Sequence, residues 1–292
     1  MKLCDAHIHL DDFAMPNASI ARSRGKRAGE MHEVHDLERL AQHLASEPLE
    51  EAYLIFSSEA SFSAAQKRIS GVTLKGWYWL RLTEGVRVGE KERSLLERLA
   101  DDPSVYGLKI HPAEDLFPLD ATSMRPVTEL ARELGFAILF HTDDRRESMH
   151  FTDADRYEKL IAENPDIIFV LGHGGAFCHP RLVGERNTAA AAYWSEERGP
   201  YSVRTSITRA LEIAATHPNA YYETSTCYHP EKARLIGAAV ERRHALCEKI
   251  VMGTDFPLGM RATVTGQLRA LERAGLSAEY IRRIAASRLP QK

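Results

Sequence analysis

The sequence contains few cysteines and no surplus of charge of either sign. Its 4 cysteines are far apart and form no Cys-x-x-Cys pair, so they predict neither a disulfide framework nor a thiolate zinc site. The net charge is −3, which gives no whole-molecule positive field that would favour nucleic acid as a partner. We therefore expect a protein of a reducing compartment that does not bind nucleic acid.

Long apolar runs are also missing. No stretch reaches the roughly 18 consecutive apolar residues that a membrane span requires, and the first residues turn polar almost at once. The composition, 44% hydrophobic and 27% charged, is typical of globular proteins. These features predict a soluble, cytoplasmic protein with no membrane partner.

Short β-rich runs alternate with helical periodicity along the chain. The predicted strands are 3–9, 52–56, 73–80, 105–111, 136–141, 167–172, 220–224 and 249–253. The predicted helices are 36–45, 64–69, 91–100, 123–134, 154–163, 203–215, 231–242, 264–274 and 278–287. Strict βα alternation indicates a parallel sheet, and eight units about 35 residues apart fit a closed barrel. We predict an α/β fold, a (β/α)₈ TIM barrel formed as a single domain by residues 1–292.

Two connections are longer than the others, 11–35 after the first predicted strand and 174–202 after the sixth. Both follow the carboxyl end of a strand, which in a barrel is the face where active sites form. We expect these loops to cover the site or to line the substrate.

Polar side chains end several of the predicted strands. His7 and His9 lie on one face of the first strand, because strand side chains alternate. Three further strands have such a residue at their carboxyl end or one or two residues beyond it, namely His141, His173 and Asp255. In a closed barrel these ends surround a single mouth. Imidazoles and a carboxylate in such a ring suit a divalent ion such as Zn²⁺ with an open position for water, so the pattern predicts a metal site.

The fourth predicted strand carries Lys109 and His111 on one face. The residues leave three roles open for Lys109: a carboxylated bridge between two metal ions, an ammonium that orients a substrate carboxylate, or a structural partner for an acid such as Asp5. Asp5 is itself a candidate partner for a ligand histidine or for the backbone. His111 and Arg81 are predicted substrate contacts, and a solvent-exposed role stays open for Arg81.

The ordered series of motifs resembles the amidohydrolase superfamily, and within it the amidohydrolase-related branch of TIM-barrel metal-dependent hydrolases. The matching segments are DAHIHL at 5–10, GLKIHP at 107–112, FHTD at 140–143, LGHGG at 171–175 and GTDFP at 253–257. His-x-His alone is a common motif, whereas the whole series in this order is specific.

The resemblance implies a role for each residue of the ring. The implied metal ligands are His7, His9, His141 and Asp255. Asp255 is in addition the implied proton acceptor, and His173 binds either a second ion or the substrate as a catalytic acid and base. We expect one divalent ion, Zn²⁺, or two ions if Lys109 is carboxylated.

This ligand set predicts a hydrolase that opens an amide, lactone or other ester bond of a small molecule. A metal-activated water would attack, Asp255 would take its proton and His173 would stabilise the developing oxyanion. A non-oxidative decarboxylase of a small unsaturated or aromatic carboxylic acid would use the same ring, and a metal-free binding barrel is a third alternative. We expect no partner except the small-molecule substrate, with a homodimer as an open alternative.

Overall fold

The computed structural model describes residues 2–10, 37–82, 87–115, 117–142, 152, 154–175, 197–198, 201–225, 229–256 and 263–291. Eight parallel strands form one sheet with the order β1-β2-β3-β4-β5-β6-β9-β10. They are β1 (Leu3–His9), β2 (Leu49–Phe56), β3 (Thr73–Trp79), β4 (Val105–Ile110), β5 (Ala137–His141), β6 (Phe169–Gly172), β9 (Ala220–Glu223) and β10 (Ile250–Val251).

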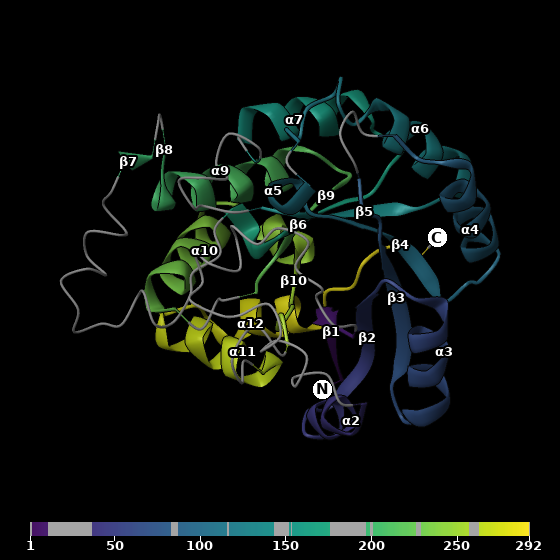
Figure 1. Ribbon diagram of the computed structural model, residues 1–292. Coiled ribbons are helices and arrows are strands. Elements are labelled where there is room, and N and C mark those ends of the chain that lie inside the picture. The colour runs from purple at the N-terminus through teal and green to yellow at the C-terminus, as the bar shows by residue number, and fades with distance from the viewer. Residues whose placement is uncertain are drawn as a thin grey trace.

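Helices surround this sheet (Figure 1). The longer ones are α2 (Leu37–Ala45), α3 (Glu59–Arg68), α4 (Glu90–Ala100), α6 (Arg125–Leu134), α7 (Ala154–Glu163), α9 (Val203–Thr216), α10 (Pro230–Arg242), α11 (Val264–Arg273) and α12 (Ala278–Ala286). Short elements are α5 (Pro112–Asp115), the 3₁₀ helices η2 (His173–Gly175) and η3 (His244–Lys249), and a hairpin of β7 (Glu197–Arg198) and β8 (Tyr201–Ser202). Among the described helices, none combines the length and the apolar character that crossing a membrane would require.

The first and last strands meet and close the sheet. The Ala6 N–H donates to the Met252 carbonyl at 2.7 Å, and the Asp255 N–H donates to the His7 carbonyl at 2.8 Å. The predicted (β/α)₈ TIM barrel is therefore confirmed. Its long connection at 11–35, and most of the one at 174–202, lie outside the described residues.

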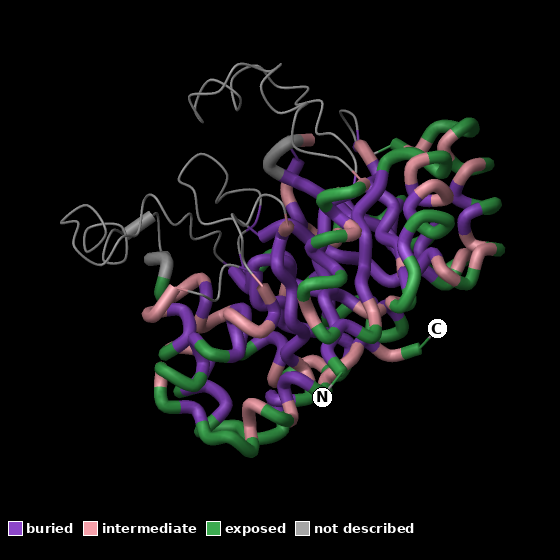
Figure 2. The backbone as a smooth tube through the Cα atoms, turned by 90° about the horizontal axis from the view of Figure 1, so that it is seen from below, coloured by how far each residue is buried: buried purple, intermediate pink, exposed green. Residues whose placement is uncertain are grey.

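Buried apolar residues form two clusters, as a closed barrel requires. Along β2, Leu54 and Phe56 belong to the larger cluster, whereas Tyr53 and Ile55 belong to the smaller one. Alternate side chains therefore pack between the sheet and the helices or inside the barrel. Figure 2 shows the result, a buried centre with exposed helix surfaces around it. The inner cluster combines aromatic and aliphatic side chains, and buried histidines and an aspartate lie at the carboxyl ends of the strands.

A register shift in β1 positions its histidines. Strict alternation from His7 would place Ala6 on the outer face with Ile8, yet Ala6 belongs to the inner cluster. The pairing of β1 with β2 shifts between Asp5 and Ile8, so one extra residue is accommodated there. Such bulges redirect side chains and are common beside active sites.

One helix starts earlier than its periodicity predicts. The pattern indicates a helix over 64–69, whereas α3 begins at Glu59. Its first turn has no apolar repeat, but Phe62 stacks on Phe56 with ring centroids 4.5 Å apart. This tertiary contact, which lies outside any local pattern, extends the helix toward its amino end.

Candidate metal centre

The two histidines of β1 meet the aspartate that follows β10. His9 Nε2 lies 2.9 Å from Asp255 Oδ1, and His7 Nε2 lies 3.4 Å from the same oxygen. All three side chains are buried. Residues 246 positions or more apart in the chain thus place their donor atoms around one point.

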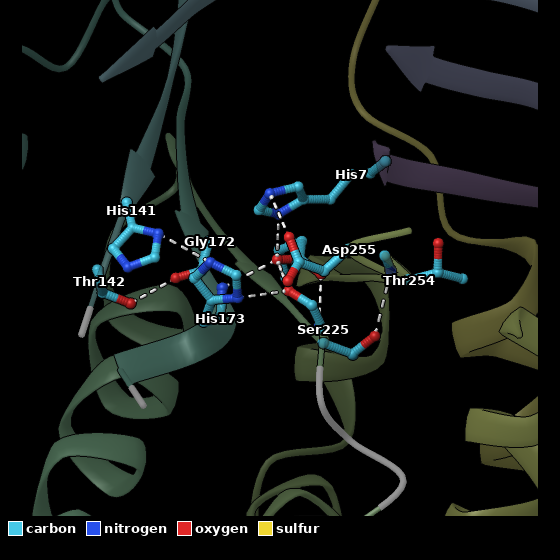
Figure 3. A network of polar contacts seen from close by, with 12 residues as sticks. His7, His141, Thr142, Gly172, His173, Ser225, Thr254 and Asp255 are labelled. Carbon is cyan, nitrogen blue, oxygen red and sulfur yellow. Dashed lines mark hydrogen bonds and ion pairs between the residues drawn. The ribbon is translucent and has the colours of Figure 1, made fainter. Parts of the chain in front are cut away.

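His141 and His173 approach the same point from the neighbouring strands. His173 Nε2 lies 2.9 Å from His141 Nδ1, and the rings of His173 and His7 are 4.9 Å apart. The candidate ligand atoms of His7, His173 and Asp255 all lie within 4.8 Å of one another. Figure 3 shows His7, His141, His173 and Asp255 gathered at the ends of their strands. The five residues that the sequence predicts in one ring are therefore brought together.

Two members of this ring have an uncommon backbone conformation. His173 and Asp255 have φ angles of 62° and 57°, in the left-handed region that residues other than glycine rarely adopt. Each such residue costs about 1 kcal/mol or more, and such residues cluster at functional sites. The conformation is held by hydrogen bonds, from the Asp255 N–H to the His7 carbonyl and from the His173 N–H to Glu223 Oε2.

Two glycines next to the ring allow the strands to approach closely. A Cβ at Gly253 would lie 2.1 Å from Glu223 Oε1 and 2.8 Å from the Cβ of His7. A Cβ at Gly172 would lie 2.4 Å from the Phe140 carbonyl oxygen. Glycine is therefore required before Thr254 and before His173, because a larger residue would clash with its neighbours.

Sequence reasoning missed Glu223, which ends β9 and is fully buried. Its Oε2 lies 2.9 Å from His7 Nδ1 and also accepts hydrogen bonds from the His173 N–H at 2.9 Å and the Ser225 hydroxyl at 2.6 Å. Burial by itself would raise the pKa of Glu223, but His7, Ser225 and the His173 N–H lower it to about 2. The sequence held one indication of Glu223. It lies two residues after Tyr221, which faces the barrel interior, so its acidic side chain points inward as well.

Asp5 binds backbone groups and not the ring of a ligand histidine. Its carboxylate accepts hydrogen bonds from the N–H groups of His7 at 3.2 Å and Thr254 at 2.9 Å, and from the Thr254 hydroxyl at 2.7 Å. It therefore ties β1 to the segment after β10. The ring nitrogen of His7 that faces away from Asp255 is held by Glu223 instead.

The predicted substrate contacts form one side of the site. The His111 ring stacks on His141 with centroids 3.7 Å apart and on Trp79 at 6.0 Å, and Trp79 also lies 6.4 Å from His9. Arg81 Cζ lies 4.9 Å from the Trp79 ring centroid. His111 thus touches the ring of histidines, and Arg81 lies one layer farther out.

Two basic groups and one acidic group lie near this side of the site. Arg81 Nε donates to Asp115 Oδ1 at 3.0 Å, and the Arg81 side chain is 36% exposed, so its cation reaches solvent. Lys109 is buried in β4, and its charge acts on both Asp255 and His173.

Burial and neighbouring charges set the protonation of the ring. Burial raises the pKa of Asp255, while the His7 imidazole partly opposes this change. Burial, then His141, His7 and Lys109, hold the pKa of His173 well below its usual value. His173 is therefore a neutral imidazole at pH 7, which is the form that can bind a metal ion or accept a proton.

The comparisons agree with this geometry. The family model described as amidohydrolase matches residues 4–287. The chain belongs to the amidohydrolase family. No curated protein matches it.

Several solved structures share the fold of this amidohydrolase family member. The dihydroorotase of Campylobacter jejuni is 17% identical with a TM-score of 0.53, and the match covers 98% of this chain and 81% of that one. The 5-carboxyvanillate decarboxylase of Sphingomonas paucimobilis is 16% identical with a TM-score of 0.54, covering 98% and 99%. The 4-oxalomesaconate hydratase of Rhodopseudomonas palustris is 14% identical with a TM-score of 0.56, covering 97% and 93%. The barrel is thus shared with proteins named for three different reactions.

The amidohydrolase family depends on metal ions, and the His and Asp cluster of this member is suited to bind a metal ion. Among the described residues, His7 Nε2 and Asp255 Oδ2 are buried and have no hydrogen-bond partner. Leaving such atoms buried without a partner costs about 1–3 kcal/mol each. Both atoms belong to residues at the point where the ring converges, and a cation bound there would satisfy them.

Proposed function

We propose that the chain is a metal-dependent hydrolase that opens an amide, lactone or other ester bond of a small molecule. The observation that carries this proposal is the convergence of His7, His9 and Asp255 on one point at the barrel mouth. One divalent ion, Zn²⁺, would be held there by His7, His9, His141 and Asp255. When bound, such an ion polarises the bond to be cleaved and lowers the pKa of water toward about 7.

The chain's own residues supply the proton transfers. The second carboxylate oxygen of Asp255 takes the proton of the attacking water and later delivers it to the leaving group. His173, neutral and buried beside Asp255, is the second acid and base. A second ion would require a carboxylated Lys109; we propose that Lys109 stays an ammonium, whose positive charge would favour the ionised form of Asp255.

We propose that the substrate carries an anionic group that contacts Arg81, with His111 beside it. The guanidinium lies over Trp79, whose ring neighbours both His9 and His111. Asp115 orients the guanidinium through Nε. This arrangement suits a carboxylate a short distance from the scissile bond.

The second candidate is a non-oxidative decarboxylase of a small unsaturated or aromatic acid. Buried Lys109 and half-exposed Arg81 favour it, because two cations beside the ring suit a substrate whose carboxylate is the leaving group. The likeness in fold to a 5-carboxyvanillate decarboxylase is consistent with this alternative.

The test is a screen of lactones, N-acyl amino acids and carboxylic acids on protein loaded with Zn²⁺ or Mn²⁺. We expect acid release without CO₂, and loss of turnover when the ion is removed by a chelator. Release of CO₂ would contradict the hydrolase proposal and support the decarboxylase. Binding of less than about a tenth of an equivalent of either ion, with no turnover, would contradict both and favour a metal-free binding barrel.

Arg81→Lys tests the anionic group. Lysine keeps a positive charge near Asp115 but loses the planar fork that grips a carboxylate, so we expect KM to rise by about 10-fold with kcat nearly unchanged. Arg98→Lys is the matched control, since Arg98 pairs with Glu59 on the surface at 3.0 Å. Equal kinetics for the two variants would remove Arg81 from the substrate site.

A further inference from the structure

The Glu223 carboxylate touches both sides of the candidate metal centre. Its Oε1 accepts the Ser225 N–H at 2.5 Å, and its Oε2 accepts the His173 N–H at 2.9 Å. Backbone N–H groups can only donate, so both oxygens of Glu223 act as acceptors. This is the pattern of an ionised carboxylate, which has no hydrogen of its own, so every further group that hydrogen-bonds to it must supply one.

This requirement determines the tautomer of His7. His7 Nδ1 lies 2.9 Å from Glu223 Oε2, so Nδ1 carries the hydrogen. In the neutral ring the other nitrogen then has a lone pair. That nitrogen is Nε2, which faces Asp255.

The same requirement reaches His173 through Ser225. The Ser225 hydroxyl lies 2.6 Å from Glu223 Oε2. It also lies 2.9 Å from His173 Nδ1 (Figure 3). A hydroxyl has one hydrogen, and this one is donated to the carboxylate. Ser225 therefore accepts the hydrogen of His173 Nδ1, and His173 Nε2 has the lone pair.

The order of donors continues to His141. His173 Nε2 lies 2.9 Å from His141 Nδ1, so His141 Nδ1 donates and His141 Nε2 has the lone pair. Buried Lys232 holds the middle of this series in place, because its ammonium donates to the carbonyls of His173 at 2.6 Å and Ser225 at 2.7 Å. A single carboxylate thus orders three imidazoles.

We infer that Glu223 is a positioning residue that acts directly on His7, and through Ser225 on His173 and His141, so that each of the three rings carries its hydrogen on Nδ1. No part of this assignment requires a bound ion, but its effect on ion affinity rests on the proposed function. One consequence is that His173 has no hydrogen on Nε2 until it has accepted a proton. Its Nε2 can therefore donate a hydrogen to an oxyanion only after it has accepted a proton.

The tautomers are measured in metal-free, full-length protein labelled with ¹⁵N-histidine, by long-range ¹H–¹⁵N correlation. We expect hydrogen on Nδ1 of His7 and His173 in the wild type. In Ser225→Ala, we expect the hydrogen of His173 to be no longer confined to Nδ1, and the tautomer of His7 to be unchanged. Thr224→Val is the matched control, since it removes a neighbouring buried hydroxyl that bonds to Gln267 rather than to a ring. Ser225→Thr keeps a hydroxyl and should restore the wild-type spectrum.

Glu223→Gln is measured by its Zn²⁺ affinity against a chromophoric chelator. In the wild type, each of the two carboxylate oxygens accepts a backbone N–H, whereas the amide of the variant has only one oxygen that can accept. We therefore expect Zn²⁺ to bind about 10–100-fold more weakly. An Nε2–H tautomer of His173 in the wild type, or no change in Ser225→Ala, would overturn the inference even if Glu223→Gln failed to fold. If the wild type bound no ion, the proposed function would fail while the tautomer assignment was decided separately.

Discussion

Asp255→Asn is expected to reduce turnover by about 10⁴-fold and to weaken metal binding, the largest effect expected of a single substitution in the site. Asp255 is proposed as both a ligand and the proton acceptor, and an amide is a weak ligand and no base. Asparagine is the appropriate replacement, because it tolerates the left-handed backbone of this position better than alanine does. The measurement is kcat/KM together with the metal content of the dialysed protein.

The control for this variant is Asp166→Asn. Asp166 is exposed and paired with Arg132 on the surface, so the same chemical change there should leave turnover and metal content as in the wild type. If Asp255→Asn kept a full equivalent of metal and more than about a tenth of the wild-type turnover, Asp255 would be neither ligand nor base.

His173→Asn is expected to lower kcat by about 10²–10³-fold while one equivalent of metal is retained. Asparagine is again suited to the backbone, whose φ is 62°. It removes the lone pair that accepts a proton but none of the four proposed ligands. The measurement is kcat at saturating substrate beside metal content from the same preparation.

His217→Asn is the control for His173→Asn, because His217 lies at the end of α9, 3.5 Å from Glu158. Loss of one ion out of two in His173→Asn would assign His173 to a second metal site and replace its proposed acid and base role. An unchanged kcat would contradict any catalytic role.

Most of the barrel could be predicted because its information is local. Each strand is a short β-rich run, each helix is periodic, and βα alternation leaves few topologies open. The ring of His7, His9, His141, His173 and Asp255 could be predicted as well, since a residue's place at a strand end is readable once the strand is placed. The start of α3 could not, because Phe62 is held by a ring on another element.

The groups behind the ring could not be predicted for the same reason. Glu223 meets His7 across 216 positions and His173 across 50; its inward position on β9 was readable from the sequence, but neither contact was. The series from Glu223 through Ser225 to His173 depends on which atoms lie within hydrogen-bonding distance. Strand periodicity places residues on a face and says nothing of such distances.

In the proposed site, the left-handed backbone at His173 and Asp255 makes stability and activity competing requirements. Glycine at either position would relieve about 1 kcal/mol of conformational strain and would delete a side chain of the site. Laboratory evolution that rewarded thermal endurance alone would therefore drift toward a sturdier but inert barrel. The strained backbone at both positions is thus a cost in stability that the proposed site imposes on the barrel.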